Sequence, residues 1–406
     1  MTFRRQRWAI ATIFAVHGAV AGTFAPRIPA IAEHLHLGAG ALGLALFMPS
    51  FGALPIMPLT GRVIHRLGPR GALQALLAFV CLALALPAVM PSLAMLCVSL
   101  VIFGAAAGAS DIAMNAQGSA LENRMGTSIM SSLHGMWSIG GFVAAAIATV
   151  ATRFDVGAPL HLAVMAGVLL VVGQLVVGTL PATGAGGVTA PVERPRFALP
   201  SGIVLVIGLV GFCAVFGEVS GSDWSAVYMR DVMHSDHATA AATYGVFAAL
   251  MAIGRLTGDR LVRRFGPART VRALALAGTV GVLLVVLGIA VPVTIVGFAL
   301  LGIGIATVVP LVFAAAGRIG SDGRAGTDGG HVAAGNAIAG VATIAYGAGL
   351  AAPGAIGGLA SATSLTWSFA LVGALVAAVA VAGGALAPRT VDARPADDNV
   401  PATVEA

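Results

Sequence analysis

The chain has 406 residues, of which 58% are hydrophobic and 9% charged, and its mean hydropathy is +0.96. Soluble proteins carry charge on about a quarter of their residues, so this composition excludes a soluble protein and indicates an integral membrane protein. The formal net charge is +6, and every basic residue is Arg. Because the arginines fall in short loops on alternate sides of apolar segments, they indicate membrane topology and no nucleic-acid binding.

Apolar segments of about 18 or more residues recur along the chain, and each is long enough to cross a hydrocarbon core of about 30 Å as a helix. The sequence therefore predicts an all-α membrane protein with twelve transmembrane helices. The expected spans are residues 8–30, 39–60, 70–90, 92–118, 127–150, 159–180, 200–222, 239–258, 268–290, 293–316, 333–356 and 365–386.

The arginines predict the orientation of these spans. With both termini in the cytoplasm, nearly all arginines fall in cytoplasmic segments, and the exceptions are Arg27, Arg153, Arg230 and Arg255. Lys and Arg accumulate in cytoplasmic loops, so we expect a multi-pass protein of the inner membrane with cytoplasmic termini.

The chain divides into two halves. Residues 181–199 are rich in Gly, Pro and Ala, which is typical of a linker. We expect a six-helix bundle at 1–180, a cytoplasmic linker at 181–199, a second six-helix bundle at 200–387 and a disordered cytoplasmic tail at 388–406.

An internal repeat relates the two halves. Landmarks of the first half recur about 198 residues later, Gly68 at Gly266, Gly104 at Gly302 and His134 at His331. The constant offset predicts two pseudo-symmetric bundles related by an axis along the membrane normal, an arrangement that places the substrate between the bundles.

Two repeated loops carry a family resemblance. GRVIHRLGPRG (61–71) and GDRLVRRFGPAR (258–269) resemble the signature loop of the major facilitator superfamily. The cytoplasmic gate-loop residues expected from this resemblance are Gly61, Arg66, Gly68, Arg70, Asp259, Arg264 and Gly266. The acidic position of the signature is His65 in the first loop and Arg263 in the second, so Asp259 or Glu122 would have to supply the charge lock of the family.

Four further segments resemble the fucose-permease-like branch of this superfamily and its YbjJ-like group. They are DIAMNAQ (111–117), HGMWSIGG (134–141), DWSAVYMRD (223–231) and GRLTGDR (254–260). The resemblance implies alternating-access transport, commonly coupled to protons, with small polar solutes such as sugars as cargo.

Asp111 is the expected proton-coupling residue. Fucose permease has a functional Glu four residues before an Asn in helix 4, and Asp111 and Asn115 match that spacing. An ionisable side chain within a span indicates function. We expect His134 or His17 as its partner, with Asp111 and His134 at the same depth, about 10 Å from the cytoplasmic edge. The alternative is a structural Asp111 whose hydrogen bonds go to Asn115 or to the backbone.

Other polar and aromatic residues of the spans complete the predicted substrate site. It comprises Asp111, Asn115, His134, Trp137, Glu218, Asn336 and Tyr346. Glu218 is expected near the outer end of helix 7, and Asp223 is expected to pair with Arg230 or Arg27. Arg255 is expected to reach the cytoplasmic edge, with a salt bridge as the alternative.

The sequence thus predicts a monomeric symporter that moves a small polar solute with protons across a lipid bilayer. No enzyme, cofactor or metal site is expected, because the chain has no Walker loop, nucleophile triad or zinc spacing. A drug or metabolite exporter is the first alternative. The G-P-x-x-G-G element of such exporters is missing from helix 5, although a similar string, APGAIGG, occurs at 352–358. A membrane sensor without transport activity is the alternative from another class.

Overall fold

The computed structural model of the chain describes residues 2–127, 129–181, 202–321 and 328–387. Within these ranges the protein is all-helical and has no β-strand. Twelve helical segments are long and apolar enough to cross a membrane, which confirms the predicted fold class. The linker and the tail expected from the sequence lie almost wholly outside the described residues.

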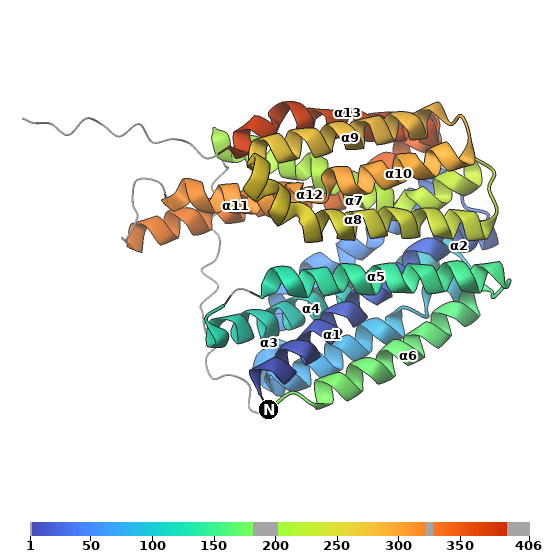
Figure 1. The fold of residues 1–406 in the computed structure, drawn as a ribbon. Helices are drawn as coiled ribbons and strands as arrows, with labels where there is room; N and C mark the ends of the chain where they lie inside the picture. The colour runs from blue at the N-terminus through green and yellow to red at the C-terminus, as the bar shows by residue number, and fades with distance from the viewer. Residues whose placement is uncertain (1, 128, 182–201, 322–327, 388–406) are drawn as a thin grey trace, which may run out of the picture.

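Helices of the two halves form two bundles, drawn in blue to green and in yellow-green to red in Figure 1. The first half contains α1 (Phe3–Phe24), η1 (Ala25–Arg27), α2 (Ile28–His34), α3 (Ala39–Ala83), η2 (Pro87–Val89), α4 (Leu93–Met125), α5 (Met130–Arg153) and α6 (Ala158–Gly178). The second half contains α7 (Ile203–Asp231), α8 (His237–Phe265), α9 (Pro267–Leu287), α10 (Val291–Ile305), α11 (Val308–Ser321), α12 (Asp328–Ala362), α13 (Leu365–Ala382) and η3 (Gly383–Leu386).

The helices begin and end at two faces of the molecule. The N-terminal face carries the start of α1, the end of α4 and the start of α5, and the face at the other end of the helices, called the opposite face, carries α2 (Figure 1).

The repeated glycines of the loops share an unusual backbone conformation. Gly68 has φ 70° and ψ 162° inside α3, and Gly266 has φ 79° and ψ 161° between α8 and α9. A side chain is disfavoured at positive φ, so glycine is required where the chain turns from one span into the next. Both turns are followed by proline, which begins a helix well.

The second repeated glycine also has the same role in each half. A Cβ on Gly104 would meet the carbonyl oxygen of Pro49 at 1.9 Å, and one on Gly302 would meet that of Phe247 at 2.5 Å. Pro49 and Phe247 are themselves 198 residues apart. The repeat therefore preserves a helix crossing so close that only glycine fits it, as small residues allow in membrane proteins.

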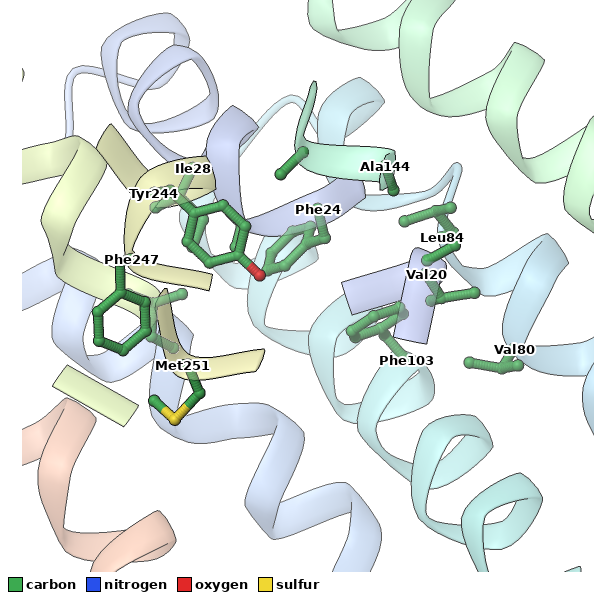
Figure 2. Packing of buried hydrophobic residues seen from close by; sticks show 14 of the residues in the cluster. Val20, Phe24, Ile28, Val80, Leu84, Phe103, Ala144, Tyr244, Phe247 and Met251 are labelled. Carbon is green, nitrogen blue, oxygen red and sulfur yellow. The ribbon is translucent and has the colours of Figure 1, made fainter. Parts of the chain in front are cut away.

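Buried side chains of both bundles contribute to one apolar cluster, and a second, smaller cluster lies within the second half. Figure 2 shows part of it, with Phe24 and Ile28 of the first half near Tyr244, Phe247 and Met251 of the second. The bundles are therefore in direct apolar contact on the side of the molecule where α1 passes into η1.

Within the first bundle, α1 and α5 cross at glycines that allow a direct test of the packing. A Cβ on Gly22 would meet the carbonyl oxygen of Gly141 at 2.1 Å. We expect Gly22→Val to push the helices apart and to lower the thermal unfolding midpoint in detergent by several degrees, because overpacking costs about 1–3 kcal/mol or more.

The matched control for that substitution is Gly167→Ala in α6, where an added Cβ meets nothing within 4 Å. Its unfolding midpoint should equal or exceed that of the wild type, since Ala favours a helix more than Gly does. Equal midpoints for Gly22→Val and the wild type would contradict the crossing.

Candidate functional site

Asp111 lies on α4 among polar groups from several helices. Its carboxylate is close enough to interact electrostatically with His17 of α1, His134 of α5 and Tyr346 of α12. Asn115 donates its side-chain N–H to the backbone oxygen of Asp111 at 2.9 Å. The Asn115 side chain therefore binds the backbone and leaves the carboxylate available.

His17 is held in one tautomer by two hydrogen bonds. Its Nδ1 lies 3.1 Å from the indole nitrogen of Trp137, and its Nε2 lies 3.2 Å from the backbone oxygen of Ala107. An indole N–H can only donate, so Nδ1 accepts and Nε2 carries the proton that it donates to Ala107. His17 is thus a neutral imidazole, and it binds α4 at Ala107, one helical turn before Asp111.

The α1 and α5 crossing positions this pair. A Cβ on Gly18 would meet the backbone oxygen of Trp137 at 1.9 Å, and one on Gly140 would meet that of Ala15 at 2.0 Å. Because these glycines let the two backbones touch, the Trp137 indole reaches the ring of His17. Trp137, predicted as part of the substrate site, therefore binds and orients the imidazole of His17.

The predicted equal depth of Asp111 and His134 is wrong. Glu122 accepts hydrogen bonds from the backbone N–H groups of Ile129 and Met130 at 2.6 and 2.8 Å, so it marks the level at which α5 starts. Counted from there at about 1.5 Å per residue, Asp111 lies about 16 Å deep and His134 about 6 Å deep. The error arose because α4 continues to Met125, seven residues past the expected end.

His134 is an exposed side chain closer to the N-terminal face, where its ring packs edge-on against Phe14 with centroids 5.3 Å apart. It interacts electrostatically with Arg255 as well as with Asp111. His17 is therefore the imidazole at the depth of Asp111, and His134 lies nearer the N-terminal face.

The second bundle contributes an ion pair. Arg255 of α8 donates from Nη2 to Oε1 of Glu218 of α7 at 2.6 Å, with side chains 22% and 25% exposed. Tyr346 interacts electrostatically with both of them and with Asp111. Asp111 of the first bundle and the Glu218 and Arg255 pair of the second are thus all within electrostatic range of Tyr346.

Two expectations about this pair are corrected. α7 runs to Asp231, so Glu218 lies in its middle and not near an end. α8 runs to Phe265, ten residues past Arg255, which is about 15 Å. The Arg255 guanidinium binds Glu218, so it forms the salt bridge that was the alternative. Two opposite charges within spans are a signal for such pairing.

Asp223 and its neighbours differ from the expectation. Arg230 binds Glu33, and Arg27 binds His161, so neither pairs with Asp223. Asp223 and Glu218 both interact electrostatically with Tyr244 of α8, a residue that the sequence analysis missed. Tyr244 is 6% exposed and lies beside Phe24 at the contact between the bundles (Figure 2).

Asn336 lies on α12, but its side chain is outside the part of the chain whose side chains are described. Tyr346, on the same helix, is 60% exposed and packs against Phe313 with ring centroids 5.9 Å apart.

The gate-loop residues lie at the N-terminal face. Gly68 and Gly266 form the turns described above, while Gly61, Arg66, Asp259 and Arg264 are exposed and Arg70 is half-buried. The Arg264 guanidinium lies over the ring of Phe265 at 5.2 Å. Glu122 caps the start of α5, and among the described residues no ion pair forms at Asp259.

Contacts between the bundles join them at the opposite face. Glu33 of α2 binds Arg230 Nε at 2.9 Å through Oε1 and lies 3.3 Å from His237 Nε2 through Oε2. Further in, α3 and α12 touch so closely that a Cβ on Gly357 would meet the Cα of Gly43 at 2.5 Å. Gly357 of the APGAIGG string therefore serves packing between the bundles, whereas a Cβ on Gly354 or Gly358 would meet nothing within 4 Å.

No cluster of three or more metal-ligating side chains occurs among the residues the structure describes. The site is instead an array of acids, imidazoles, an arginine and aromatic rings from both bundles. Such an array can bind a polar solute and transfer a proton.

Comparisons with solved structures agree with the fold. The nucleoside transporter NupG, as a mutant, superposes with a TM-score of 0.74 at 13% identity, covering 94% of this chain and 99% of that one. A bacterial homologue of the human lysosomal transporter Spinster, inward-facing and occupied, gives a TM-score of 0.67 at 12% identity over 94% and 95% of the two chains. At these identities the likeness concerns the fold alone.

Comparisons with sequences find relatives of higher identity. The chain is 35% identical to the uncharacterised transporter y4wD of Sinorhizobium fredii, over 92% of this chain and 96% of the relative. It is 33% identical to an uncharacterised MFS-type transporter of Yersinia pestis, over 92% and 94%. Residues 10–343 match the Major Facilitator Superfamily. The chain therefore belongs to the major facilitator superfamily of membrane transporters.

Proposed function

We propose that this chain is a secondary active transporter that imports a small polar solute, with a sugar as first candidate, in symport with protons by alternating access. The observation that carries the proposal is the polar array between the bundles. An acid of the first bundle, Asp111, and an ion pair of the second, Glu218 with Arg255, all interact electrostatically with Tyr346.

The residues of the array have complementary roles in this proposal. Asp111 takes up and releases the coupling proton, and His17 lies within electrostatic range of its carboxylate. The imidazole can receive the proton at Nδ1 once the Trp137 indole N–H releases that nitrogen. His134, one step nearer the N-terminal face, continues the path. Tyr346 and the Glu218 and Arg255 pair bind polar groups of the solute, together with Asn115 and Asn336 from their helices. Trp137 orients His17.

The proposed orientation puts the N-terminal face and the gate loops in the cytoplasm of a cell with an inner membrane. It rests on the arginines in the loops of that face. In this proposal, residues 1–180 and residues 200–387 are the two bundles that move against each other during transport. In this orientation, the contacts of Glu33 with Arg230 and His237 close the outward side.

Export and sensing are the rival functions. Within APGAIGG at 352–358, Gly357 has a packing role at Gly43, so its presence there gives export no additional support. A sensor has no need for a protonatable array at the contact of two movable bundles.

A two-step experiment tests the proposal. Purified protein is first screened for solutes that raise its unfolding midpoint, because a ligand of the folded state stabilises it. Proteoliposomes that contain a trapped pH-sensitive dye then receive each stabilising solute. Symport predicts acidification of the lumen on solute addition. Alkalinisation would support an exporter, and binding without any proton or solute flux would support a sensor.

A further inference from the structure

A buried arginine outside the polar array has no counter-ion among the residues that the structure describes. Arg27, at the end of η1, is 4% exposed, and its Nε donates to Nδ1 of His161 on α6 at 3.1 Å. No acidic side chain of the described residues lies within 4.0 Å of its guanidinium nitrogens. The nearest acid along the chain, Glu33, is bound by Arg230 and His237.

The hydrogen bond between the two side chains determines which protons remain free. An arginine stays charged and can only donate, so Nδ1 of His161 accepts and Nε2 carries the ring proton. Nη2 of Arg27 and Nε2 of His161 are both buried, and neither has a hydrogen-bond partner in the described part of the chain. The pair therefore holds one positive charge and two orphan positions that are both N–H donors.

Neighbouring backbone adds to the positive potential. His161 is in the first turns of α6, which begins at Ala158, has Gly157 at its N-cap without a side-chain hydrogen bond, and has no acidic residue in its first turn. The N-terminus of a helix carries partial positive charge. An unpaired buried charge is costly, and neither the His161 ring nor the start of α6 offsets it.

We propose that Arg27 and His161 form a binding site for a small monovalent anion, either chloride or the carboxylate group of an organic acid. The anion accepts the orphan Nη2–H of Arg27 and offsets its charge. Since η1 contacts α5 of its own bundle and α7 and α8 of the other, the site lies where the bundles meet near the opposite face. It is separate from the array around Asp111.

The test compares anions on the purified full-length protein. Sodium chloride, acetate and sulfate are titrated at constant ionic strength while the unfolding midpoint is recorded. Chloride or acetate should raise the midpoint saturably by about 3 °C, whereas sulfate, a larger divalent anion, should not. A response to chloride alone identifies a halide site, and a response to acetate identifies a carboxylate site.

Two variants assign the effect to the site. Arg27→Gln should abolish the saturable response, and Arg153→Gln, which removes an exposed arginine, should retain it. Direct binding of radioactive chloride to the wild type, competed by unlabelled chloride or acetate, keeps the proposal testable if Arg27→Gln does not fold. Equal midpoints in all three salts together with no competed chloride binding would overturn the proposal, as would an unchanged response in Arg27→Gln. Failure of this site leaves proton transport through Asp111 unaffected.

Discussion

Asp111→Asn is expected to reduce solute-driven proton influx into proteoliposomes about 100-fold or more, while the variant still binds the solute. Asn has nearly the shape of Asp but cannot release a proton, and removing a group that transfers a proton costs about two to four orders of magnitude in rate. The helix should be undisturbed, because Asn115 binds the backbone oxygen of residue 111 and not its side chain.

Dye-loaded proteoliposomes measure this effect, with Asp155→Asn as the matched control. Asp155 is an exposed acid between α5 and α6 with φ 54°, a conformation that Asn also tolerates. The control makes the same chemical change outside the spans and should transport like the wild type. Proton influx at the wild-type rate in Asp111→Asn would remove Asp111 from the mechanism.

His17 provides a second comparison within the same assay. His17→Gln keeps polar atoms near Trp137 and Ala107 but removes the titratable ring. If the proton passes from Asp111 to His17, influx falls strongly while solute binding persists. If Asp111 exchanges directly with His134, the fall appears in His134→Gln instead.

The twelve spans were predictable because hydropathy and length are properties of a local segment. The turns at Gly68 and Gly266 were predictable for a related reason, since Gly-Pro breaks a helix wherever it occurs. Helix ends are set by contacts from other parts of the chain, such as the Glu122 carboxylate at the start of α5. Depths calculated from assumed helix ends were therefore wrong for Asp111, His134 and Glu218.

Pairing between distant side chains was the other limit of the sequence. Glu218 and Arg255 were each noted as charges within spans, and a salt bridge was the alternative for Arg255, but the sequence did not identify Glu218 as the partner at 2.6 Å. The same holds for Arg27 with His161, which are 134 residues apart. The joint position of His17 and Trp137 depends on glycines of two helices, so it too required the tertiary structure.

The Glu218 and Arg255 ion pair gives the second large expected effect. Each charge lies within a span and is mostly buried, so a single neutralisation leaves its partner without a counter-ion. We expect Glu218→Gln and Arg255→Gln each to lower the free energy of unfolding by about 2 kcal/mol or more, and the double variant to be more stable than either. Unfolding in mixed micelles with increasing dodecyl sulfate measures the three changes.

A double-mutant cycle then separates the pair from its surroundings. The coupling between Glu218 and Arg255 should be about 1 kcal/mol or more, because direct contact within one ion pair couples two residues. Glu33 and Arg230 provide the comparison, since Glu33 is 43% exposed and solvent screens such a pair, so their coupling should be much smaller. Equal couplings would mean that the central pair is as solvated as the peripheral one.

Loss of solute uptake in the double variant despite its recovered stability would assign the charges to solute binding, whereas recovered uptake would limit them to folding.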